Sequence, residues 1–97
     1  MDFFSINPLN NKKNKSFKFH TEDQIRKKIQ LSLKSQEEWK ATSLSKRVLY
    51  LRMLSVTLDK NKIKYAKMMA LEMGKPIEQG LEEIEKCIWL CNFYFEN

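Results

Sequence analysis

The chain has 97 residues, 42% hydrophobic and 31% charged, a balance that excludes intrinsic disorder and allows one small domain. Glycine and proline occur only twice each, which argues against a many-turned β fold and favours long helices. The net charge is +6, distributed as +3 over residues 1–20, +7 over residues 21–71 and −4 over residues 72–97. A basic balance without a recognition motif gives little support for a specific nucleic-acid site.

The sequence also indicates in which cellular compartment the protein is expected. No stretch is long and apolar enough to span a membrane, and the opening residues 1–8 lack the basic region of a signal peptide. The two cysteines, Cys87 and Cys91, lie within a helical pattern rather than at loop positions suited to disulfides. We therefore expect a reduced, cytoplasmic setting with no membrane partner.

Residues 1–21 are predicted to form an extended leader. Asn7-Pro8 favours a turn, and Asn10-Asn11 tolerates the left-handed backbone conformation. The alternation of Phe and Lys between Ser16 and His20 indicates a short strand. The two arms of the leader can pair as a hairpin, which must lie on another element because an isolated hairpin is marginally stable.

The first helix is predicted over residues 22–40. Thr21 and Gln24 have the spacing of a capping box, and Glu22 and Asp23 place negative charge at the positive end of the helix. The apolar face of this helix comprises Ile25, Ile29 and Leu33, with Trp39 near the same line.

A second helix is predicted over residues 44–60 and a third over residues 62–73. The inward residues of the second are Leu44, Val48, Leu51, Ser55 and Leu58, with Leu49 and Leu54 widening this stripe, and those of the third are Ile63, Ala66 and Ala70. The residues expected on the solvent side of the second helix are Lys46, Arg47 and Arg52. Gly74 can end the third helix in the left-handed conformation, with Pro76 just beyond it.

A fourth helix is predicted over residues 77–95. Its stripe has 4-3-4-3-4 spacing and comprises Ile77, Leu81, Ile84, Ile88, Cys91 and Phe95. Beyond Lys86 the helix is apolar all round, which is typical of a helix buried on every side. The other helices can cover the stripe but not also Trp89 and Phe93. We therefore expect that the chain is incomplete and that in isolation it folds poorly or self-associates.

No catalytic or metal-binding set is apparent in the sequence. His20 is the only histidine and stands in a turn without a partner for acid–base or nucleophilic chemistry. Cys87 and Cys91 are one helical turn apart, but zinc requires three or four ligands, so we interpret them as buried thiols. We expect no catalytic, cofactor-binding or metal-binding residue in this chain.

The remaining candidates also have structural interpretations. The glutamates Glu72, Glu78, Glu82, Glu83 and Glu85 are expected on solvated helix faces, with Glu82 and Lys86 as an i,i+4 pair. Gly74 and Gly80 are isolated and form no phosphate-binding loop. The methionines Met68, Met69 and Met73 are expected to fill gaps in the core.

Two runs of residues have a distinctive pattern: Glu72-Met73-Gly74-Lys75-Pro76-Ile77 and the stretch from Glu83 to Asn97. Both resemble the NAD(P)-dependent aldehyde dehydrogenases, and within them the succinate-semialdehyde dehydrogenases. Further similarities follow in order along the chain, at Ser5-Ile6-Asn7-Pro8, Phe19-His20-Thr21, Trp39-Lys40, Arg47 and Leu51-Arg52. One departure is Leu9-Asn10-Asn11, where the family often has Ala-Thr-Gly.

The resemblance covers only the beginning of the family's pattern, and it implies a segment of an α/β enzyme. Residues 22–97 correspond to helices on the outside of the cofactor-binding domain, with the fourth helix directed towards the substrate entrance. In the family, a cysteine thiolate attacks the aldehyde, hydride passes to NAD or NADP, and the thioester is hydrolysed. The catalytic cysteine, the general-base glutamate and the dinucleotide-binding residues come later in the family's pattern, so Cys87 and Cys91 do not correspond to the nucleophile.

The sequence therefore predicts a mainly α chain: an extended hairpin leader, residues 1–21, followed by about four helices in an incomplete domain, residues 22–97. We expect a truncated or split aldehyde dehydrogenase, inactive alone, which binds no cofactor itself and has the rest of the enzyme as its partner. The alternative is a small basic helical module that binds an acidic partner or nucleic acid. The DNA downstream of the codon for Asn97 distinguishes the two.

Overall fold

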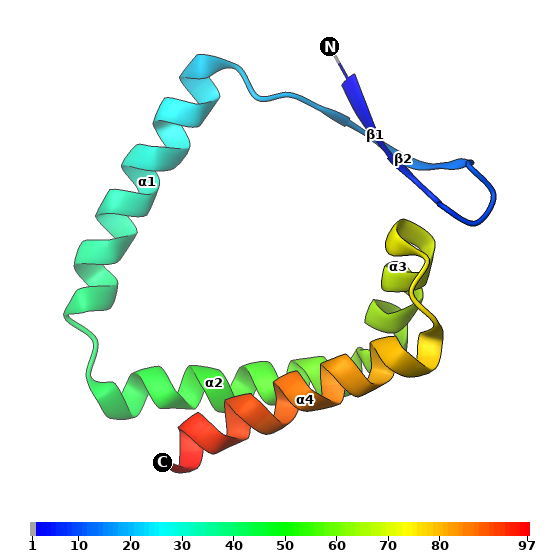
Figure 1. Ribbon diagram of the computed structural model, residues 1–97. Helices are drawn as coiled ribbons and strands as arrows, with labels where there is room; N and C mark the ends of the chain where they lie inside the picture. The colour runs from blue at the N-terminus through cyan, green and yellow to red at the C-terminus, as the bar shows by residue number, and fades with distance from the viewer. Residues whose placement is uncertain (1) are drawn as a thin grey trace.

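The computed structural model describes residues 2–97 and shows a two-stranded hairpin followed by four helices (Figure 1). The elements are β1 (Asp2–Ile6), β2 (Lys13–Lys18), α1 (Glu22–Lys40), α2 (Leu44–Lys60), α3 (Lys62–Met73) and α4 (Ile77–Glu96). The predicted mainly α fold with a hairpin leader is confirmed, and the helix bounds agree except that α4 continues to Glu96. Met1, which the predicted leader includes, lies outside the described residues.

The hairpin forms where the leader sequence predicts it. β1 and β2 pair antiparallel, with Phe3 opposite Phe17 and their rings stacked 5.3 Å apart, and the register shifts between Ser5 and Ile6. The strand predicted between Ser16 and His20 lies closer to the N-terminus than expected, because β2 runs from Lys13 to Lys18. Asn11 has a φ of 59° and occupies the left-handed position that glycine takes in many tight turns.

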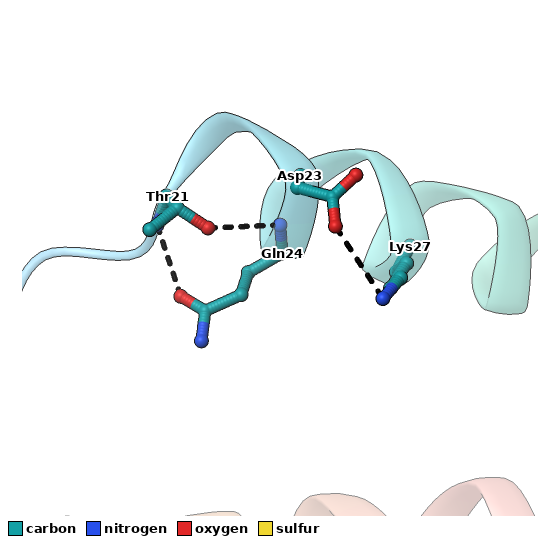
Figure 2. A network of polar contacts seen from close by, with 4 residues as sticks. All are labelled: Thr21, Asp23, Gln24 and Lys27. Carbon is teal, nitrogen blue, oxygen red and sulfur yellow. Dashed lines mark hydrogen bonds and ion pairs between the residues drawn. The ribbon is translucent and has the colours of Figure 1, made fainter.

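Helix α1 begins at the predicted capping box, shown in Figure 2. The backbone N–H of Gln24 donates to the Thr21 hydroxyl at 3.2 Å, and the backbone N–H of Thr21 donates to the Gln24 side-chain carbonyl at 2.9 Å. One turn further, Asp23 and Lys27 form an i,i+4 ion pair at 3.4 Å. Both side chains are largely exposed, so this pair contributes little stability, whereas the box fixes where the helix starts.

The core lies where α4 packs between α2 and α3. Its buried residues are Ala66 on α3, Gly80 and Ile84 on α4, and Ser55 on α2. A Cβ added to Gly80 would meet the Cα and Cβ of Ala66 at 3.3 Å, so these two small residues allow the backbones of α3 and α4 to approach closely. Across the other contact, the Arg52 guanidinium donates to the Asn92 side-chain carbonyl at 2.9 Å.

Helix α1 has no buried residue. Ile25, Ile29 and Leu33 share one face as predicted, but they are 46%, 55% and 62% exposed. In Figure 1, α1 extends away from the α2–α4 pair and lies apart from the hairpin, and its last turn meets the start of α2. The dimensions are 47 × 40 × 15 Å and the Cα radius of gyration is 17.6 Å. A compact domain of this length has a radius of gyration of about 12–13 Å.

Leu49 and Leu54, predicted to widen the inward stripe of α2, are 53% and 46% exposed, because they lie beside the side of α2 that α4 covers. Three further residues predicted to face inward are exposed. Leu44, Ile63 and Ile77 are 76%, 57% and 46% exposed. Each lies at or next to the first residue of its helix, beyond the part of the helix that a neighbour covers. The central members of the predicted stripes, such as Val48, Ala70 and Ile88, are half-buried. Within residues 2–97, no helix has the length and hydropathy needed to cross a membrane.

Candidate functional site

The residues with the most specific sequence pattern, Glu72 to Pro76, lie at the joint between the hairpin and α3. The Ser5 hydroxyl donates to the Glu72 carboxylate at 3.1 Å. The Asn14 side-chain amide donates to the Leu71 carbonyl at 2.8 Å and to the Ser5 hydroxyl at 3.2 Å. The hairpin therefore rests on the last turn of α3, which supplies the support that an isolated hairpin lacks.

The link between α3 and α4 is tight because of Gly74. Its φ is 71° and its N–H donates to the Ala70 carbonyl at 3.0 Å, which ends α3 with the predicted left-handed cap. Pro76 directly precedes α4, and its carbonyl accepts from the N–H of Gly80 at 3.0 Å. Between them, Lys75 forms an ion pair with Glu83. These residues shape the backbone, in agreement with the structural role predicted for them.

The candidate nucleophiles and ligands do not converge. His20 is exposed in the linker before α1, and Cys87 and Cys91 lie on α4. Cys87 is exposed and Cys91 is half-buried, so the prediction that both thiols are buried is wrong for Cys87. Among residues 2–97, no group of three or more His, Cys, Asp or Glu side chains could hold a metal ion.

The glutamates are exposed as predicted, and three of them have partners. Glu72 accepts from Ser5, Glu83 pairs with Lys75, and Glu85 lies 3.9 Å from Lys62. The predicted pair between Glu82 and Lys86 is absent from the ion pairs that residues 2–97 form within 4 Å.

The methionines differ from their predicted role. Met68 and Met73 are 49% and 65% exposed, so the prediction of core packing is wrong for these two. Met69 is half-buried, and its sulfur would lie 3.4 Å from a Cβ on Gly80. The outer side of α3 has no covering element, which explains why only one of the three fills a gap.

Sequence reasoning missed the role of Arg47, which was expected on the solvent side. Its guanidinium donates to the carbonyls of Trp39 and Lys40, both at 3.0 Å, and lies 5.6 Å from the centre of the Trp39 indole. Arg47 thereby satisfies carbonyls at the C-terminal end of α1, where positive charge is favourable. One sequence feature could have indicated this role of Arg47. An arginine that lies four residues after the N-cap Ser43 is within reach of the end of the preceding helix.

A hollow of about 500 Å³ lies beside Arg47, between the end of α1, α2 and the end of α4. Its lining is mainly apolar and comprises Trp39, Leu44, Arg47, Val48, Tyr50, Leu51, Leu54, Tyr94 and Asn97. A second hollow of about 490 Å³ lies at the hairpin joint, lined by Pro8, Leu9, Ala70 and residues 73–77. The side chains that line these two hollows include no histidine, cysteine, aspartate or glutamate.

Comparison with known proteins decides the family. The model of the aldehyde dehydrogenase family matches residues 2–97. This chain belongs to the aldehyde dehydrogenase family. Among curated aldehyde dehydrogenases, a probable NADP(+) succinate-semialdehyde dehydrogenase of Synechocystis sp. is 29% identical over 94 residues, which is 97% of this chain and 21% of that protein. An NAD(P)+ succinate semialdehyde dehydrogenase of Escherichia coli is 31% identical over 93 residues, which is 96% of this chain and 20% of that protein. The chain thus spans about a fifth of the length of these relatives.

The residues of this aldehyde dehydrogenase segment do not fit the dinucleotide that the family uses. A dinucleotide site places a glycine-rich turn between a strand and the N-terminus of a helix. Within residues 2–97, β2 leads into α1 without a glycine, Gly74 packs against Pro8, and Gly80 packs against Ala66.

Proposed function

We propose that this chain supplies part of the scaffold of a cytoplasmic aldehyde dehydrogenase that oxidises succinate semialdehyde with NAD or NADP. The family is established for residues 2–97, and both relatives described above carry that activity in their names. The role of the chain in this proposal is structural. It supplies the hairpin, the joint at Gly74 and the helices, while the reactive groups and the cofactor site belong to the rest of the enzyme.

The observation that carries this proposal is the apolar surface left uncovered on α1 and α4. Ile29 on α1 is 55% exposed, and on α4 Trp89 and Phe93 are 64% and 42% exposed. The stacked rings of Trp89 and Phe93, 5.5 Å apart, face away from the buried side of α4. Burying one such side chain is worth about 1.5–3 kcal/mol, so covering these surfaces would contribute strongly to stability.

We propose that the remaining dehydrogenase polypeptide covers these apolar surfaces of α1 and α4. It is either joined to this chain or supplied as a second chain. The chain corresponds to 20–21% of the length of its relatives, so most of a dehydrogenase is available to provide it. Alone, the chain is expected to have no dehydrogenase activity.

A chimera tests the scaffold role. The segment of the Escherichia coli relative that matches this chain is replaced by residues 2–97, and oxidation of succinate semialdehyde is measured with each cofactor. We expect activity from the chimera and none from the same relative with the segment deleted. A second chimera with Trp89→Glu and Phe93→Glu should be inactive or insoluble if the rest of the enzyme covers α4. A folded but inactive first chimera would contradict the scaffold role.

The aldehyde and the cofactor require a separate test, because the chimera takes its catalytic site from the relative. The DNA that continues past the codon for Asn97 is sequenced, and the protein encoded by the joined region is assayed. Oxidation of succinate semialdehyde in preference to other aldehydes supports the proposed substrate. A purified dehydrogenase with no preference for it would contradict that part of the proposal.

A further inference from the structure

The outward side of α4 carries a stripe of acidic and aromatic residues. This acidic stripe comprises Glu82, Glu85, Trp89, Phe93 and Glu96, at 3-4-4-3 spacing, and all five residues are exposed. Phe93 is nine residues from the buried Ile84, which places it on the opposite side of the helix. The one cation on α4 within the described residues is Lys86, beside Glu82 and Glu83. The stripe therefore presents an apolar centre between negative ends.

The outward side of α2 carries the matching pattern in the opposite charge. This basic stripe comprises Lys46, Leu49, Met53, Val56 and Lys60, at 3-4-3-4 spacing, and all five residues are exposed. Met53 is two residues from the buried Ser55, about 200° away around the helix. Leu49, Met53 and Val56 are 53%, 61% and 54% exposed. This stripe presents an apolar centre between positive ends.

The two stripes match in length as well as in charge. Lys46 and Lys60 are fourteen residues apart, as are Glu82 and Glu96, so in each stripe the terminal charges are separated by about 21 Å of helix. None of these four side chains takes part in the ion pairs formed within residues 2–97. All four charges are therefore available to a partner.

The stripes cannot meet within one molecule. Helices α2 and α4 pack against each other through their buried sides, with Arg52 bonded to Asn92 and the start of α2 near the end of α4. Figure 1 shows the two helices running side by side. Since each stripe lies on the side of its helix opposite the buried residues, the two stripes point away from each other. They can meet only between two copies.

The exposed area is large enough for such a contact. The accessible surface of the chain is 8447 Å², whereas a compact monomer of 11.6 kDa exposes about 5,800 Å². The excess is about 2,600 Å², and a stable protein–protein interface buries about 800 Å² on each partner. Two such contacts would bury about 1,600 Å² of one copy, which is less than this excess, although part of the excess belongs to the uncovered α1.

We propose that this chain binds a second copy of itself head to tail, with the acidic stripe of one copy lying on the basic stripe of the next. The contact is heterologous, so each copy keeps one stripe free, and association extends into chains of copies as the concentration rises. The aromatic and aliphatic centres supply the affinity, and the terminal charges set the register. This inference concerns the chain without the rest of a dehydrogenase and does not rest on the proposed function.

Charge reversal tests the contact by sedimentation velocity over a range of concentrations. One variant carries Lys46→Glu and Lys60→Glu, and a second carries Glu82→Lys and Glu96→Lys. Each variant alone places like charges on both stripes, whereas a mixture of the two restores opposite charges. Two controls change the net charge by the same amount away from the stripes: Lys34→Glu with Lys64→Glu, and Glu37→Lys with Glu38→Lys. Circular dichroism verifies that each variant keeps its helicity.

We expect the wild-type chain and both controls to associate, and each stripe variant to need about a tenfold or greater concentration to reach half-association. An equimolar mixture of the stripe variants should associate like the wild type. A monomeric wild type overturns the proposal. The proposal is also overturned if the Lys46→Glu, Lys60→Glu variant associates as strongly as the wild type. In that case α4 would pair with α4 or with α1, and not with the basic stripe. A mixture that stays monomeric contradicts the assigned contact.

A second measurement uses the wild type alone and does not depend on the folding of any variant. Raising the salt concentration from about 50 mM to about 500 mM should weaken the association, because exposed charge pairs are screened at these ionic strengths. Association that is unchanged or strengthened over this range would indicate a purely apolar contact and would overturn the pairing of the two stripes.

Discussion

The Cγ of Pro8 lies 3.0 Å from the point where a Cβ on Gly74 would be, so the hairpin turn and the end of α3 meet at a position where any side chain would be crowded. Gly74 also has a φ of 71°, which other residues adopt at a cost of about 1–2 kcal/mol. The two constraints act together, because a residue there must accept the left-handed conformation and also leave room for the proline ring.

Gly74→Ala is therefore expected to destabilise the chain by about 1–3 kcal/mol. Urea unfolding followed by circular dichroism measures this change. Gly80→Ala is the comparison, since Gly80 is helical and its penalty comes from contact with Ala66 at 3.3 Å and with the Met69 sulfur at 3.4 Å, offset by the higher helix propensity of alanine. If Gly74→Ala were as stable as the wild type, the joint between the hairpin and α3 would not constrain the chain as described.

Thr21→Ala should weaken the start of α1 by about 1 kcal/mol, because it removes the hydroxyl that accepts from Gln24. Hydrogen exchange of the first turn of α1 is the measurement. Ser35→Ala, an exposed change within the same helix, should leave exchange there unchanged. Equal exchange rates in the wild type and Thr21→Ala would show that the capping box does not fix this helix end.

Arg47→Lys should loosen α1 from α2 while leaving the α2–α4 contact intact. Lysine keeps the charge but cannot reproduce the planar guanidinium that bonds to two carbonyls and lies over Trp39. The expected loss is about 1–2 kcal/mol, seen as faster exchange in the last turn of α1 and not in α4. Lys46→Arg is the matched control. Faster exchange throughout the chain would indicate a general loss of stability instead.

The helix bounds could be predicted because their signals are local. Thr21 and Gly74 each mark an end through their own backbone or side-chain bonds, and the structure uses both. Asn11 was also predicted correctly, as a residue that tolerates the left-handed region. Periodicity likewise identified Ile84 as the centre of the α4 stripe, and Ile84 is buried.

The burial of side chains was harder to predict than the helix bounds, because burial depends on elements that are distant in the sequence. Periodicity shows that Ile25, Ile29 and Leu33 share a face, but not that no element covers it. The same reason accounts for Cys87, exposed on a helix that reads as fully buried. Arg47 was missed because its partners are carbonyls of another helix, which no side-chain pattern reveals.

Binding to nucleic acid should be weak, salt-sensitive and indifferent to sequence. The net charge is +6, but the basic residues are spread over several elements and residues 72–97 carry −4. We expect duplex DNA of any sequence to bind alike at about 50 mM salt and to dissociate by about 200 mM. Fluorescence anisotropy with two unrelated duplexes measures this. Tight binding of one duplex at the higher salt would favour the basic binding module over the dehydrogenase scaffold.

We propose that this chain is a scaffold segment whose side chains perform no dehydrogenase chemistry. To test this, the purified chain is incubated with succinate semialdehyde and NAD+ or NADP+, and the absorbance of the reduced cofactor is followed. We expect no reduced cofactor above a blank without protein. Cofactor reduction that is lost when Cys87 or Cys91 is changed to serine would contradict it, because the nucleophile would then lie within this chain.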